Sequence, residues 1–212
     1  MNTEAAPKVE LLDPPGSSGV RPPREKSGVV YTRAWVVDLI LDLVGYHPTL
    51  DLAKTLAVEP AAGDGAFLVA IARRLVASCR IHGRSLVDAE RSLMGYELDE
   101  ESAMSARKAV ANALLAVAVD PAQAKDVARS WVRTGDYLLD AHQLPRADFV
   151  IGNPPYIRLE DIPSPVATAY RSAYRTMRGR ADIYVAFYEA ALRQLKPDGV
   201  CGLICADRWM LN

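Results

Sequence analysis

The sequence predicts an α/β fold: a doubly wound, mostly parallel sheet of the Rossmann-like kind. Two patterns carry this prediction. Short apolar runs typical of buried strands alternate with longer segments of helical periodicity, and glycine, acidic or amide residues directly follow the runs. Half of the 212 residues are hydrophobic, which suffices for one core. The expected strands are residues 56–60, 92–97, 130–134, 148–152 and 200–206.

The chain begins with a segment rich in proline, glycine and serine. Residues 1–27 contain Pro7, Pro14, Pro15, Pro22 and Pro23. We expect a disordered N-terminal extension there, because such a composition buries too little apolar surface to fold.

The first helix is expected over residues 34–44, where apolar residues recur with helical spacing. Thr32 is the expected N-cap. Gly45 is the expected stop, because glycine accommodates the left-handed residue that commonly ends a helix.

The run at residues 56–60 leads into Gly63-Asp64-Gly65 and then into a helix over residues 68–76. A strand, a glycine-bearing turn and a helix let the backbone approach a nucleotide-like ligand closely. Any tight turn between a strand and a helix also favours glycine, so the turn alone does not decide between the two readings.

Two further strands end in acids. Glu97 closes residues 92–97, where such folds usually hold a ribose diol, and Asp99 is the expected N-cap of a helix that runs to about residue 117. Asp136 follows residues 130–134, either to bind an adenine amino group or as a turn aspartate.

The most specific stretch follows the strand at residues 148–152. Asn153-Pro154-Pro155-Tyr156 must end that strand, because proline donates no ladder hydrogen bond. The Asn153 side-chain oxygen and the Pro154 carbonyl could accept the two N–H bonds of an aromatic amine. Tyr156 could stack on the ring. The alternative is a turn that merely ends a strand.

The segment at residues 157–180 is expected to be a loop of local charge +3. A phosphate backbone could lie along it, although a solvated surface loop is the alternative. Its basic residues are Arg158, Arg171, Arg175, Arg178 and Arg180. A helix over residues 182–195, a turn at 196–199 and the last strand complete the chain.

Composition and motif spacing argue against several classes of protein and of binding site. The net charge of −1 gives no global basic field, and three scattered histidines predict no metal site. Three cysteines without paired spacing favour a reducing, cytoplasmic compartment. There is no apolar run of membrane-spanning length and no signal peptide.

Together these motifs resemble an S-adenosylmethionine-dependent adenine-N6 DNA methyltransferase of the gamma type found in restriction–modification systems. The resemblance covers residues 28–212, the expected catalytic domain, with a class I methyltransferase fold. It implies that Asn153, Pro154, Pro155 and Tyr156 hold the target adenine. The cofactor residues that it implies are Tyr31, Thr32, Glu59, Ala61, Gly63, Gly65, Glu97, Leu98, Asp136, Tyr137 and Asn153.

The sequence departs from that family in places. Arg33 stands where proline is frequent, and Ala62 and Asp64 stand where the family's turn has cysteine and a small hydroxyl residue. The family also continues with two more strands and a target-recognition domain, so we expect an N-terminal part of such an enzyme. The implied partners are double-stranded DNA, a recognition domain or subunit and a restriction endonuclease. No metal is implied.

Two alternatives remain open. A protein glutamine methyltransferase uses the same Asn-Pro-Pro-Tyr chemistry on a side-chain amide, but usually lacks the Tyr31-Thr32 start and the arginine-rich segment. The other alternative is a truncated, inactive or split methyltransferase that needs a partner.

Overall fold

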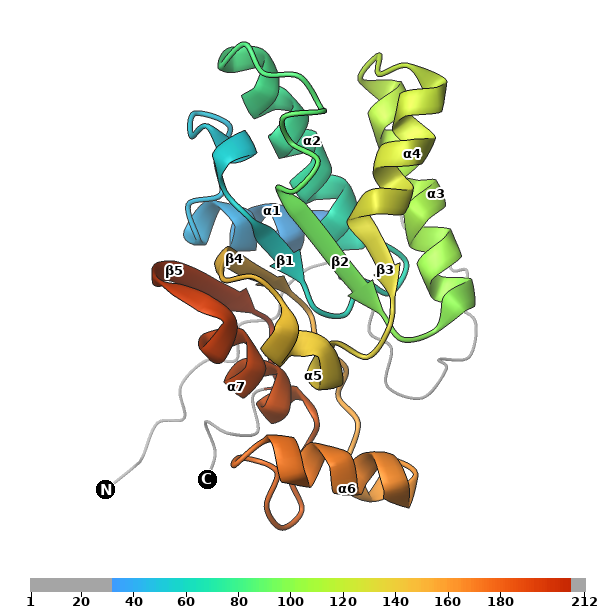
Figure 1. Cartoon of the computed structure of the whole chain (residues 1–212), viewed down its shortest axis with the longest axis vertical. Coiled ribbons are helices and arrows are strands. Elements are labelled where there is room, and N and C mark those ends of the chain that lie inside the picture. The colour runs from blue at the N-terminus through green and yellow to red at the C-terminus, as the bar shows by residue number, and fades with distance from the viewer. Residues whose placement is uncertain (1–31, 207–212) are drawn as a thin grey trace, which may run out of the picture.

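The computed structural model describes residues 32–206, so the expected disordered extension and Tyr31 lie outside the described residues. Five parallel strands form one sheet in the order β3-β2-β1-β4-β5 (Figure 1). The predicted doubly wound parallel sheet is therefore confirmed. The strands are β1 (Ala57–Glu59), β2 (Leu93–Glu97), β3 (Val132–Thr134), β4 (Ala147–Gly152) and β5 (Leu195–Leu203).

Helices cover both faces of this sheet. The α-helices are α1 (Ala34–Leu43), α2 (Ala66–Ile81), α3 (Glu100–Ala116), α4 (Pro121–Trp131), α5 (Tyr137–Asp140), α6 (Ser164–Ala173) and α7 (Tyr184–Gln194). Short 3₁₀ turns are η1 (Leu52–Lys54), η2 (Ala141–Gln143) and η3 (Leu159–Asp161). In Figure 1, α6 lies apart from the sheet, below α5 and α7.

The central strands divide the core into two layers. Ala57 pairs with Phe149 and both pack with α1 to α4, whereas Val58 pairs with Val150 and both pack with α5 to α7. Successive side chains of a strand point to opposite faces of the sheet, so two buried layers require runs that are apolar at every position.

Two glycines permit close packing of helices on this sheet. A Cβ atom on Gly95 would lie 2.7 Å from the Leu68 methyl groups of α2. A Cβ atom on Gly202 would lie 2.4 Å from Cγ1 of Val44, directly after α1. The absence of a side chain at both positions lets these helices approach the strands.

The end of α1 agrees with the prediction, and its start does not. Gly45 has φ +73°, and the N–H groups of Gly45 and Tyr46 bond the carbonyls of Asp42 and Leu41, which is a Schellman motif. The N-cap is Arg33, without a side-chain bond, so the expected Thr32 cap is wrong. The Thr32 hydroxyl has another partner, Asn153.

Three other expectations need correction. Residues 130 and 131 belong to α4, which was not predicted; its start is marked by the Asp120 cap and by Pro121 in the first turn. Residues 157–180 contain η3 and α6 and are not one loop. The expected turn at 196–199 lies within β5 as a bulge, because Leu195 and Val200 pair with Ala147 and Phe149.

Candidate active site

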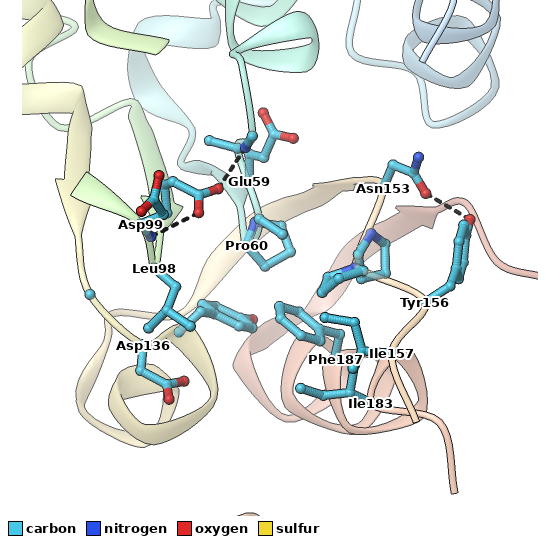
Figure 2. A pocket seen from close by; sticks show the side chains of 18 of the residues that line it. Glu59, Pro60, Leu98, Asp99, Asp136, Asn153, Tyr156, Ile157, Ile183 and Phe187 are labelled. Atoms are coloured by element: carbon cyan, nitrogen blue, oxygen red, sulfur yellow. Dashed lines mark hydrogen bonds between the residues drawn. The ribbon is translucent and has the colours of Figure 1, made fainter. Parts of the chain in front are cut away.

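A cavity of about 660 Å³ opens where the strands end, at the carboxyl edge of β1, β2, β3 and β4. Figure 2 shows Leu98 and Asp136 at one end of it and Asn153 and Tyr156 at the other, with Glu59 and Pro60 between. The structure thus gathers most of the predicted site residues into one space. Those that line it are Thr32, Glu59, Ala61, Gly63, Glu97, Leu98, Asp136, Tyr137, Asn153, Pro154, Pro155 and Tyr156.

The glycine turn after β1 is tied to the acid at the end of β2. Gly63 has φ +54°, and its N–H donates to Oε2 of Glu97 at 2.7 Å. Oε1 of Glu97 accepts from the Asp99 N–H at 3.0 Å. Both hydrogen bonds orient the Glu97 carboxylate at the cavity wall, while the Asp99 side chain caps α3 through the Ser102 N–H, as expected.

Glu59 is the most deeply buried acid of this wall. Its side chain is 1% exposed, and Oε2 has no hydrogen-bond partner among the described residues. Burial, and then the nearby Glu97 carboxylate, raise the pKa of Glu59 well above its usual value. A buried, unpartnered carboxyl oxygen beside an open cavity suits a ligand that brings a cation or an N–H donor.

The Asn153 amide is held on both sides. Its Nδ2 donates to the Thr32 hydroxyl at 3.1 Å, and its Oδ1 accepts from the Tyr156 hydroxyl at 2.7 Å (Figure 2). Burial raises the pKa of Tyr156 to about 12, so this hydroxyl is a donor at neutral pH. The Tyr156 ring packs edge to face against the Tyr184 ring, with 6.0 Å between the ring centroids. The corner after β4 is therefore preorganised.

Asp136 has the local role of a turn aspartate. Its Oδ1 accepts from the N–H groups of Leu138 and Leu139 at the start of α5. Its Oδ2 accepts from the Tyr170 hydroxyl of α6 at 2.7 Å. Because Asp136 also lines the cavity, the capping role and the predicted binding role are compatible at this position.

Some predicted residues lie elsewhere. Gly65 does not line the cavity; it has φ +92° and a Cβ atom there would lie 3.1 Å from Cα of Ala106. All five arginines of the basic segment are exposed and none lines this cavity. Arg158 and Arg180 line a second, smaller cavity, and Arg171 bonds the carbonyls of Met177 and Gly179. Their DNA contacts stay a prediction.

The sequence did not reveal the apolar lining. Phe67, Tyr170, Ile183 and Phe187 contribute to the cavity wall from three different helices and the turn before α7. Ile183 and Phe187 lie in the helix predicted over residues 182–195, but no local signal separates a core face of a helix from a cavity wall. Tyr170 had no signal at all.

Within residues 32–206, no group of three or more histidine, cysteine or acidic side chains is placed to hold a metal ion. Across the same part of the chain, no helix combines the length and apolarity needed to cross a membrane.

A family model described as Eco57I restriction-modification methylase matches residues 93–212, which include β2 to β5 and the Asn153 corner. The chain belongs to this family. It is 42% identical over 193 residues to the type II methyltransferase M.XhoI of Xanthomonas vasicola, covering 89% of this chain and 35% of that protein. It spans about a third of the length of the curated relatives M.XhoI, M.PaeR7I and M.BstVI.

Solved structures confirm the fold of this family member. The M protein of the type I restriction enzyme EcoKI matches with a TM-score of 0.60 at 19% identity, over 84% of this chain and 34% of that one. A Listeria monocytogenes protein assigned to the class I S-adenosylmethionine-dependent methyltransferases matches with a TM-score of 0.52 at 15% identity, over 84% and 46%. The predicted class I methyltransferase fold is therefore confirmed.

Proposed function

We propose that this chain forms the cofactor-binding and catalytic part of a DNA adenine-N6 methyltransferase that uses S-adenosylmethionine. One observation carries the proposal. The Asn153 corner and the carboxyl groups of Glu59, Glu97 and Asp136 line the same cavity. A site for an aromatic amine thus lies beside acceptors suited to an adenosine and to a cationic amino acid.

The residues present fit that cofactor. Glu97, held by the Gly63 and Asp99 N–H groups, offers carboxylate oxygens to a ribose diol. Asp136 offers its carboxylate to an adenine amine, and Leu98 and Tyr137 supply apolar surface beside it. The unpartnered Oε2 of Glu59 would receive the cationic amino-acid end, near Thr32. The bound cofactor supplies an electrophilic methyl group on a sulfonium.

The target base would be held by the corner after β4. Asn153 Oδ1 and the Pro154 carbonyl would accept the two N–H bonds of the exocyclic amine, drawing its lone pair out of the ring and towards a tetrahedral geometry. The incoming amine would share Oδ1 with the Tyr156 hydroxyl or displace it, because that hydroxyl already donates there. Once displaced, the Tyr156 ring could stack on the base, which must leave its duplex at a cost of a few kcal/mol.

Substrate and partners follow from the family. The matched relatives are type II methyltransferases, so we propose double-stranded DNA as substrate and a restriction endonuclease as functional partner. The exposed arginines of residues 157–180 would face the phosphate backbone. A recognition region, in the same protein or in a subunit, would choose the site.

The test is transfer of labelled methyl groups from S-adenosylmethionine to unmethylated genomic DNA, followed by nucleoside analysis. N6-methyladenine in the product supports the proposal. Methylated cytosine, or label on glutamine side chains of protein, would overturn it. Binding of S-adenosylhomocysteine, measured in parallel by calorimetry, distinguishes a chain that lacks a recognition region from one that lacks the cofactor site.

A further inference from the structure

The chain segment after the Asn153 corner begins and ends at neighbouring positions, joined by backbone hydrogen bonds. The Ile183 N–H donates to the Ile157 carbonyl at 2.8 Å, and the Leu159 N–H donates to the Ala181 carbonyl at 3.1 Å. Residues 157–183, called here the α6 segment, are thereby closed at the base by backbone hydrogen bonds. The segment holds all five predicted DNA-binding arginines.

The α6 segment also forms one wall of the candidate active site. Ile162, Pro163, Val166 and Tyr170 line the cavity together with Asp136. A part of the chain that the sequence assigned to the DNA surface therefore contributes to the space proposed for the cofactor.

Tyr170 makes a polar contact across this wall. Its side chain is 3% exposed, and its hydroxyl donates to Asp136 Oδ2 at 2.7 Å. Burial, and then the adjacent Asp136 carboxylate, raise the pKa of Tyr170, so the hydroxyl keeps its proton at neutral pH. The other oxygen, Oδ1, accepts from Leu138 and Leu139. The Asp136 carboxylate is thus fixed in rotation by donors on both oxygens.

A second tyrosine of the same segment offers an internal comparison. Tyr174 is 5% exposed, and its hydroxyl donates to the backbone carbonyl of Leu138 in α5. Both tyrosines therefore anchor the α6 segment on α5. Only the Tyr170 hydroxyl reaches a carboxylate that lines the cavity, and Tyr174 is not part of the lining.

We propose that Tyr170 is a positioning residue that orients the Asp136 carboxylate to read the adenine amine of the cofactor. The inference rests on the proposed function, since it deepens the role of Asp136 in that site. It makes the α6 segment part of cofactor recognition as well as part of the proposed DNA-binding surface.

The experiment compares two ligands on three proteins. S-adenosylhomocysteine carries the adenine amine, and S-inosylhomocysteine carries an oxo group in its place. Calorimetry gives the ratio of their affinities for the wild type, Tyr170→Phe and Tyr174→Phe. A hydrogen bond to a charged group commonly raises binding affinity by about tenfold or more. We expect a ratio of about tenfold in the wild type and in Tyr174→Phe, and a ratio close to one in Tyr170→Phe.

If Tyr170 has only a structural role, Tyr170→Phe weakens the binding of both ligands equally and leaves the ratio of their affinities unchanged. That result overturns the inference. An unchanged ratio in Tyr170→Phe at unchanged affinity overturns it as well. Thermal melts show whether each variant is folded, and Tyr174→Phe controls for the loss of a buried hydroxyl on the same segment. Failure of the wild type to bind S-adenosylhomocysteine would contradict the proposed cofactor site itself, which is a separate result.

Discussion

Replacement of Asn153 by alanine separates the chemistry of the corner from the binding of the cofactor. Among the described residues, the side chain hydrogen-bonds with Thr32 and with Tyr156. At about 0.5–1.5 kcal/mol each, their loss lowers the free energy of unfolding by about 1–3 kcal/mol. The residues that would hold the cofactor adenosine, Glu97 and Asp136, have other partners and keep them.

The expected loss of catalysis is larger than the loss of stability. A preorganised polar group aimed at the charge that develops in the transition state typically contributes about 100- to 1000-fold in rate. We therefore expect Asn153→Ala to lower single-turnover methyl transfer by at least that factor. Affinity for S-adenosylhomocysteine should change less than about threefold, because no hydrogen bond of Glu97 or Asp136 is lost.

Thr32→Val is the matched control for this variant. It removes the acceptor of the Asn153 Nδ2 bond but leaves the amide oxygen in place. Transfer should fall less than in Asn153→Ala, and the free energy of unfolding should fall by about 0.5–1.5 kcal/mol, because only one of the two hydrogen bonds is lost. The reasoning is refuted if transfer and cofactor affinity fall together in Asn153→Ala, or if transfer survives that substitution under conditions in which the wild type is active.

Three further predictions concern stability. The pKa of Glu59 is raised in the folded state, so folding favours its protonated form. Its contribution to the free energy of unfolding is therefore fully present below about pH 4.5 and is lost as pH rises through the folded pKa. The melting temperature of Glu59→Gln minus that of the wild type, measured without cofactor, should thus grow with pH; a constant difference would contradict the assignment. The Tyr46 hydroxyl is buried without a hydrogen-bond partner among the described residues. Tyr46→Phe should therefore raise the free energy of unfolding in urea by about 1 kcal/mol. A decrease of the same size would show that the hydroxyl does have a hydrogen-bond partner. Gly202→Ala places a Cβ atom 2.4 Å from Cγ1 of Val44 and should lower the free energy of unfolding in urea by about 1–3 kcal/mol. An unchanged free energy would mean that the end of α1 can shift to accommodate the Cβ atom without loss of stability.

Much of the chain could be interpreted locally. Apolar runs predicted β1, β2 and β4 to within a few residues, because these central strands are covered on both faces and are mostly buried. The two edge strands are largely exposed: β3 is shorter than predicted, and β5 begins at Leu195 and ends at Leu203, where residues 200–206 were expected. Asp99 and Gly45 marked helix ends, because a cap satisfies backbone groups within a few residues of itself. α4 was missed although Asp120 and Pro121 carry a readable start signal.

The sequence by itself determined which residues stand at the strand ends, and hence which side chains reach one edge of a parallel sheet. Only the tertiary structure decided how they are held. Thr32 and Asn153 are 121 residues apart in the chain, and Tyr170 meets Asp136 across 34 residues. Such contacts depend on how helices pack on the sheet, and no periodicity or cap signal encodes that packing. The same reason explains why a segment predicted to be a basic loop became the α6 wall of the cavity.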